Sequence, residues 1–112
     1  MQFFLYFTMK EGEQGPQPPS PEAMAEMGRF TQEAVEAGRV PATGQLKGTT
    51  HVRLVDGKVS ATDGPFIEGK ELIPGFTIFR VDSKQEAIDI AAKHCEWLGM
   101  DVRIAQVAGP TD

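Results

Sequence analysis

The first predicted strand of the chain is apolar on both of its faces, and this feature constrains the fold more than any other. Residues 2–8 form a short run rich in aromatic side chains, which is typical of a β-strand. Alternation divides the run into one face with Phe3, Leu5 and Phe7 and another with Phe4, Tyr6 and Thr8. A strand covered by helices on one side normally presents water-compatible side chains on its other side. In so short a chain, we expect a second subunit to cover the second face, which predicts a homodimer.

The length of the chain and its composition predict one globular domain over residues 1–112. A chain of 112 residues falls within the usual size of a single domain. Its residues are 40% hydrophobic and 24% charged, which is too apolar for intrinsic disorder.

The charge of the chain argues against polyanionic partners. The formal net charge is −5 and no run of basic residues occurs. Affinity for nucleic acids comes largely from Lys and Arg side chains that neutralise phosphates. Anionic membrane surfaces attract clusters of the same residues. We therefore expect neither nucleic acid nor membrane among the partners.

The cysteine content and the first residues favour a cytoplasmic protein. Cys95 is the only cysteine, whereas small secreted domains usually carry several disulfides. The apolar residues 2–7 lack a preceding basic region and a following cleavage site, and they are too few to span a bilayer.

Two helices are predicted from their capping residues and apolar periodicity. Ser20 and Pro21 are typical of a helix N-terminus, and the helix predicted over residues 22–37 ends at Gly38. Ser83 and Glu86 form a capping-box pattern before a second helix over residues 84–97. The buried face predicted for this second helix consists of Ala87, Ile88, Ala91, Ala92, Cys95 and Leu98.

The remaining elements are strands and loops. Asp56-Gly57 between two alternating runs predicts a hairpin with arms at residues 51–55 and 58–62. Further strands are expected near residues 44–46 and over residues 76–81 and 102–107, with loops over 10–21 and 63–75. The order of elements predicts an α+β fold, a ferredoxin-like sandwich with an added β-hairpin.

The loop after the hairpin carries a motif of fixed spacing. It contains Asp63-Gly64-Pro65-Phe66, followed by Glu68, by Lys70-Glu71 and by Gly75-Phe76. This segment resembles the signature of the DGPF domain family, a branch of the YCII-related superfamily. The resemblance implies a ferredoxin-like fold that forms a dimeric α+β barrel. Most relatives have no established activity, some are linked to sigma factors of RNA polymerase, and a few act as enzymes.

Two positions depart from what the resemblance implies. The enzymatic branch has a His–Asp pair with its histidine near the start of the first helix, where this chain has Ser20-Pro21-Glu22-Ala23. The family often shows an acidic residue, an aliphatic residue and an arginine near the C-terminus. Two registers of the last strand match that pattern differently, so the assignment of Arg103 to the site stays open.

Asp63 is the main candidate for chemistry. A carboxylate partly buried at the lip of a cleft can act as a general base, and His51 or Arg53 on the neighbouring hairpin arm could reach the same rim. Phe66, Lys70 and Glu71 are further candidates for ligand binding. The structural alternative is an Asp that accepts backbone hydrogen bonds within its own turn, with Lys70 and Glu71 making fold or dimer contacts.

No other constellation indicates a cofactor or a metal. The sequence contains no phosphate loop, dinucleotide fingerprint or nucleophile elbow. Two histidines and one cysteine at no recognised spacing give no basis for a zinc site. His94 is expected at the surface or the edge of the core, while Cys95, Trp97, Met24 and Met27 are expected to pack as apolar residues.

Three functions remain open from the sequence. The first is a small-molecule-binding or sensing homodimer with a pocket between the sheet and the loop 63–75. The second is a small enzyme, a lyase or hydrolase, that uses Asp63 as acid or base with His51 or Arg53 assisting. The third is a regulatory module that binds a transcription-related protein partner.

Overall fold

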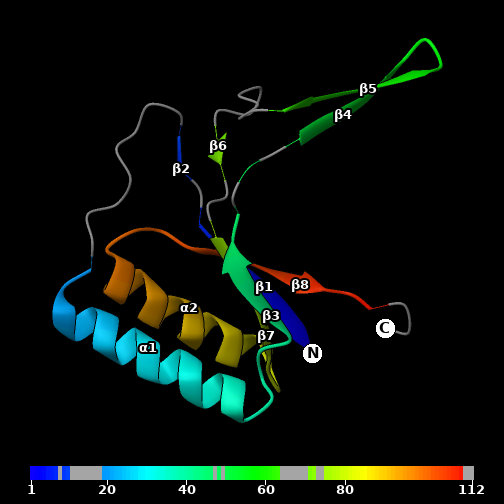
Figure 1. Ribbon diagram of the computed structural model, residues 1–112. Helices are drawn as coiled ribbons and strands as arrows, with labels where there is room; N and C mark the ends of the chain where they lie inside the picture. The colour runs from blue at the N-terminus through cyan, green and yellow to red at the C-terminus, as the bar shows by residue number, and fades with distance from the viewer. Residues whose placement is uncertain are drawn as a thin grey trace.

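A four-stranded antiparallel sheet with two helices on one face forms the body of the protein (Figure 1). The computed structural model describes residues 1–7, 9–10, 19–46, 48, 50–63, 71–72 and 75–109, and structural statements refer to these residues. The elements are β1 (Gln2–Tyr6), β2 (Met9–Lys10), α1 (Pro21–Glu36), β3 (Ala42–Gln45), β4 (Thr50–Val55), β5 (Lys58–Asp63), β6 (Glu71–Leu72), β7 (Gly75–Arg80), α2 (Lys84–Leu98) and β8 (Arg103–Val107). The predicted helices, hairpin and main strands are present, with ends shifted by one or two residues.

The strand order β3-β7-β1-β8 is consistent with the predicted ferredoxin-like fold. The opening strand β1 lies between β7 and β8, and it is antiparallel to both. Sequence reasoning missed one short strand pair, which joins β2 to β6. The loops predicted over 10–21 and 63–75 are therefore wrong at residues 10 and 71–72. No helix among the described residues is long and apolar enough to span a membrane.

The two faces of β1 have different surroundings, as its alternation predicts. Phe3 and Leu5 are buried under the helices, where they pack with Phe79, Val81, Ala87 and Ile90. On the other face, Phe4 is half-buried, and its ring lies 5.1 Å from that of Tyr6 and 5.6 Å from that of Phe76, centroid to centroid. This helix-free face is therefore aromatic.

The buried face of α2 differs from the prediction. Ala87, Ile90 and His94 are its buried residues, whereas Ile88 is 41% exposed and Ala92 is exposed. The spacing of the buried positions is the three-and-four pattern of an ideal helix. The prediction is confirmed at Ala87 and is wrong at Ile88 and Ala92, and it left out His94 because it treated this residue as polar.

Helix α1 has no buried residue, although it is 16 residues long. Phe30 and Ala34 are the α1 side chains that pack against the core cluster. The ring of Phe30 lies 6.0 Å from Phe79, 5.9 Å from His94 and 5.7 Å from Trp97. The helix thus rests on the core through a narrow line of contact.

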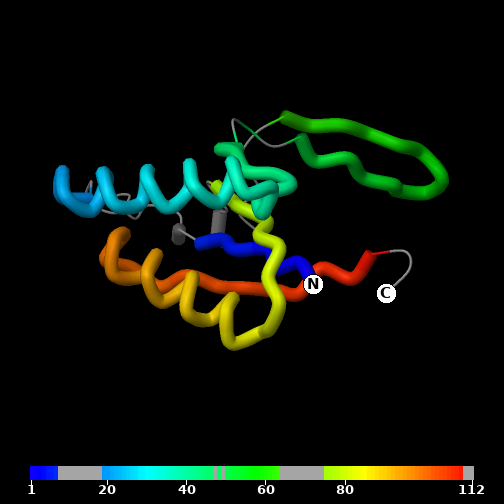
Figure 2. The backbone as a smooth tube through the Cα atoms, turned by 90° about the horizontal axis from the view of Figure 1, so that it is seen from below, coloured from blue at the N-terminus to red at the C-terminus, as the bar shows by residue number. Residues whose placement is uncertain are grey.

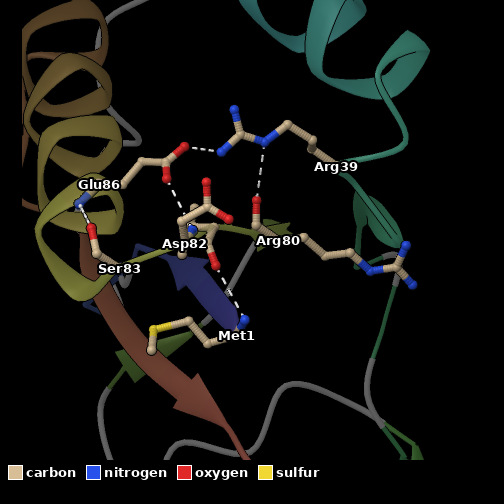
Figure 3. Close-up of polar contacts among 7 residues, drawn as sticks. Met1, Arg39, Arg80, Asp82, Ser83 and Glu86 are labelled. Carbon is tan, nitrogen blue, oxygen red and sulfur yellow. Dashed lines mark hydrogen bonds and ion pairs between the residues drawn. The ribbon is translucent and has the colours of Figure 1, made fainter.

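A polar network joins the end of α1 to the start of α2 (Figure 3). Arg39 forms an ion pair with Glu86 and donates from Nε to the Arg80 carbonyl at 3.2 Å. Ser83 caps α2 by accepting from the Glu86 N–H at 3.1 Å, as predicted. The Glu86 carboxylate, however, accepts from the backbone N–H of Asp82 at 3.0 Å, one residue before the expected partner.

The hairpin β4–β5 extends away from the helices and the sheet (Figures 1 and 2). Its turn has φ = 51° at Asp56 and 77° at Gly57, the left-handed pair that the dipeptide predicts. The register places Val52 opposite Ala61 and Leu54 opposite Val59, so one face of the ribbon is apolar. Val52, Leu54 and Val59 are 62%, 71% and 71% exposed.

Candidate functional site

An open groove of about 920 Å³ lies between α1 and the sheet. Its wall on α1 includes Met24, Met27, Gly28 and Thr31. Its opposite wall includes residues 43–45 of β3 and Leu46, which follows this strand. Leu5, Phe7, Phe76, Thr77, His94 and Leu98 also line it. The volume and the mostly apolar lining with a few polar groups are those of small-molecule sites.

The narrow contact line of α1 explains why the groove exists. Met24 is 55% exposed and Met27 is half-buried, so neither fills the space beside Phe30 in the way predicted from packing. Gly28 leaves a gap in the same wall, because a Cβ built there meets no other atom within 4 Å. Helix α1 therefore forms one wall of the groove, and its side chains leave the space between this wall and the sheet unfilled.

His94 is the buried polar residue of the described core, with 6% of its surface exposed. Its prediction as a surface or core-edge residue is corrected by this burial. Nδ1 lies 2.9 Å from the Ile90 carbonyl, so this nitrogen carries the hydrogen and donates it. Burial lowers the pKa of His94, and the ring is neutral at pH 7 as a result.

The second nitrogen of His94 is available to the groove. Nε2 has no hydrogen-bond partner among the described residues, yet no fully buried polar side-chain atom among them lacks a partner. The ring of His94 is one of the residues that line the groove. In the neutral tautomer, this nitrogen is a hydrogen-bond acceptor.

Two threonines add a polar pair to the groove. The Thr43 hydroxyl donates to the Phe76 carbonyl at 3.2 Å, and its oxygen lies 2.9 Å from that of Thr77. Since Thr43 uses its hydrogen on the carbonyl, Thr77 donates to Thr43 in this chain. The Thr77 oxygen then retains its lone pairs as an acceptor.

Asp63 lies at the end of β5, away from this groove. Its Oδ1 accepts a hydrogen bond from the Thr50 hydroxyl at 2.7 Å, across the ribbon from it. His51 pairs with Thr62 and Arg53 with Ser60, and alternation directs both to the opposite face of the ribbon from Asp63. The register thus does not bring these three predicted site residues together.

The other residues predicted for the site have different outcomes. Phe66 and Lys70 lie outside the described residues. Glu71 pairs with Lys10 through the backbone of β6, and Arg103 lies opposite Tyr6 in β8. Within the described part of the chain, no group of three His, Cys, Asp or Glu side chains could hold a metal ion.

Sequence reasoning missed the groove because its walls come from distant segments. The signal that was available is the position of His94, which follows Ala87 by seven residues and Ile90 by four. Those spacings place a histidine on the buried stripe of a helix. A histidine at such a position must satisfy its nitrogens inside the fold.

Comparison with known proteins gives a family. The family model of the YCII-related domain matches residues 1–106. A search among curated proteins finds no match to the chain. Because the match extends from β1 through most of β8, the chain belongs to the YCII-related domain family.

Proposed function

We propose that the protein is a small-molecule-binding or sensing homodimer and that the groove beside α1 is its ligand site. The observation that carries this proposal is the groove itself, which has about 920 Å³ of space and a buried histidine in its lining. Sites for small organic molecules have this size, and they combine an apolar lining with a few polar groups that orient the ligand.

The groove differs from the pocket expected between the sheet and the loop 63–75, because its second wall is α1, but the two share part of their lining. Phe7, one of the aromatic residues that motivated that expectation, does line the groove, as does residue Phe76, whose ring packs against Phe4 on the helix-free face. The enzymatic alternative has less support, because the Asp63 carboxylate is exposed, is bonded to Thr50 and faces away from His51 and Arg53.

Two apolar surfaces support the homodimer. One is the aromatic helix-free face of the sheet, with Phe4, Tyr6 and Phe76. The other is the apolar face of the hairpin, with Val52, Leu54 and Val59. The radius of gyration is 16.4 Å, whereas a compact domain of this length has about 13 Å. A second copy that covers both surfaces would account for their composition, and the family resemblance implies such a dimeric α+β barrel.

The motif that begins at Asp63 supports membership of the DGPF branch within the YCII-related family. In this proposal, Asp63 is the first residue of the motif, and its hydrogen bond with Thr50 holds the end of the β4–β5 ribbon together. The cytoplasmic location predicted from the single cysteine belongs to the same proposal.

The direct test is a thermal-shift screen of neutral, acidic and basic metabolites. A compound that binds only the folded state raises the melting temperature with its concentration. The groove is tested by Gly28→Leu, which fills open space on α1, with Gly28→Ala as the matched control. Both changes favour the helix by about 0.5–1 kcal/mol, so neither should unfold the protein. Shifts that survive in Gly28→Ala and vanish in Gly28→Leu support the groove, and no shift with any compound would overturn the proposal.

The homodimer is tested by light scattering at micromolar concentrations. Leu54→Lys places a charge on the apolar face of the hairpin, while Arg53→Lys on the opposite face is its control. We expect the first variant, and not the second, to shift the equilibrium toward monomer. A wild-type protein that is monomeric at these concentrations would contradict the proposal.

A further inference from the structure

The groove contains no charged side chain among the described residues that line it. A charged ligand that entered the groove would lose hydration, and none of the described lining side chains carries an opposite charge that would offset this loss. The lining therefore favours ligands that are uncharged.

The inner polar atoms of the groove are acceptors. His94 commits its only hydrogen to the Ile90 carbonyl, which leaves Nε2 with a lone pair. Thr77 commits its hydrogen to Thr43, whose own hydrogen goes to the Phe76 carbonyl. A ligand that offers only acceptors would leave these atoms unpaired once water is displaced.

The histidine is fixed in this role by its surroundings. Its ring lies 5.9 Å from Phe30, 5.9 Å from Phe79 and 5.1 Å from Trp97, in edge contacts with all three. These rings and the bond to Ile90 oppose rotation of the imidazole. Nε2 is consequently preorganised as an acceptor before any ligand binds.

We propose that the groove selects uncharged, mostly apolar molecules that carry a hydrogen-bond donor, such as an aliphatic alcohol or a phenol, and that the donor binds His94 Nε2. This inference rests on the proposed function, and it adds the chemical class of the ligand. The Thr77 hydroxyl oxygen is a second acceptor for the same hydroxyl or for a further one. Thr31 and Gln45, also in the lining, can supply donors to other polar atoms of the ligand.

The test compares molecules of one length that differ in their polar end. The probes are 1-octanol, octanoate and heptyl methyl ether, titrated into the full chain at pH 7.5 by calorimetry and by Trp97 fluorescence. Trp97 is the only tryptophan, and it contacts the ring of His94. Pairing of a buried acceptor predicts about tenfold tighter binding of the alcohol than of the ether, or ~1.4 kcal/mol. Octanoate should bind at least as weakly as the ether.

Two variants assign the preference to atoms. His94→Phe keeps an aromatic ring and removes the acceptor, so the alcohol should lose its advantage over the ether. Thr77→Val removes the second acceptor at nearly constant volume, and it tests the same inference if His94→Phe does not fold. Thr62→Val on the hairpin, outside the groove, is the matched control and should retain the wild-type ratio.

The outcomes distinguish a failure of the proposed ligand site from a failure of the proposed ligand class. If none of the three probes binds and the broad screen also fails, the ligand site itself is wrong. If octanoate or the ether binds as tightly as the alcohol, the site stands and the class is overturned. A preference for the alcohol that persists in both variants would overturn the role of His94 and Thr77. Binding that weakens as protein concentration rises would show that a second copy occupies the groove, and this would overturn the inference too.

Discussion

Phe30 is predicted to anchor α1, and replacing it with alanine should cost about 3 kcal/mol of folding free energy. Its ring contacts the rings of Phe79, His94 and Trp97 at 6.0, 5.9 and 5.7 Å. Each aromatic pair is worth about 0.5–1.5 kcal/mol beyond the area that it buries. Complete loss of a core Phe costs about 3–5 kcal/mol, and the half-buried position of Phe30 places it at the lower end. No fully buried residue of α1 compensates for the loss.

The effect is measured by urea unfolding followed by Trp97 fluorescence and by far-UV circular dichroism. For a chain of this size, about 3 kcal/mol should lower the urea midpoint by roughly 1.5–2 M and the melting temperature by about 10–15 °C. Val35→Ala is the control, because Val35 is 50% exposed on the same helix and its loss should change stability by less than about 0.5 kcal/mol. All proteins are compared at one concentration, since dimerisation would make the midpoint concentration-dependent.

A cost below about 1 kcal/mol for Phe30→Ala would refute the reasoning. It would mean that α1 is held by contacts other than the line through Phe30 and Ala34. A midpoint that differs between fluorescence and dichroism would instead show that α1 detaches before the sheet unfolds.

Three further predictions concern pH, the helix cap and the hairpin. Burial lowers the pKa of His94 below 6.5 in the folded state, so the unfolded state binds a proton first as pH falls through about 6.5. Stability should therefore be complete above that pH and fall toward the folded pKa. Unfolding curves from pH 7.5 to 5 should lose this component of their slope in His94→Phe, and an unchanged slope would contradict the prediction. Glu86→Ala should lower the free energy of unfolding by about 1–2 kcal/mol in thermal unfolding, and Glu86→Gln by less than about 1 kcal/mol. Glutamine keeps an oxygen that accepts from the Asp82 N–H, and the partly exposed ion pair with Arg39 contributes little. Equal losses in the two variants would contradict this reasoning. Gly57→Ala strains a residue at φ = 77°, so it should accelerate hydrogen exchange of the β4 and β5 amides while the global midpoint changes little; unchanged exchange would show that the turn does not limit the ribbon.

The elements that local chemistry specifies could be predicted from the sequence. Ser20 with Pro21 and Ser83 with Glu86 mark the two helix starts, and both serines do accept from backbone N–H groups. Asp56-Gly57 specifies the turn and hence the register of the hairpin. In each case, the residues that determine the element are neighbours in the chain. The alternation of β1 likewise divided its residues correctly between the two faces of the sheet.

The features that depend on tertiary packing could not be predicted in this way. The stripe of α2 includes His94, whose burial is tolerated because one nitrogen bonds to a backbone carbonyl within the same helix. The groove needs Gly28, Phe7, Phe76 and His94 together, and no local signal relates these positions. The predicted meeting of His51 with Asp63 rested on their places in neighbouring arms of one hairpin, whereas the register of the ribbon puts their side chains on opposite faces.

The energetics of the hairpin indicate how the two apolar surfaces would act in a dimer. Full burial of a Val or Leu side chain is worth about 1.5–3 kcal/mol, so the exposed fractions of Val52, Leu54 and Val59 correspond to roughly 3–6 kcal/mol per chain. A twofold arrangement doubles this to roughly 6–12 kcal/mol, which only matches the cost of association of about 4–15 kcal/mol. The hairpin alone would therefore give a marginal dimer, and the aromatic face around Phe4 must contribute for the dimer to be stable. Leu54→Lys should accordingly weaken the dimer without abolishing it, whereas charges on both surfaces together should leave only monomer.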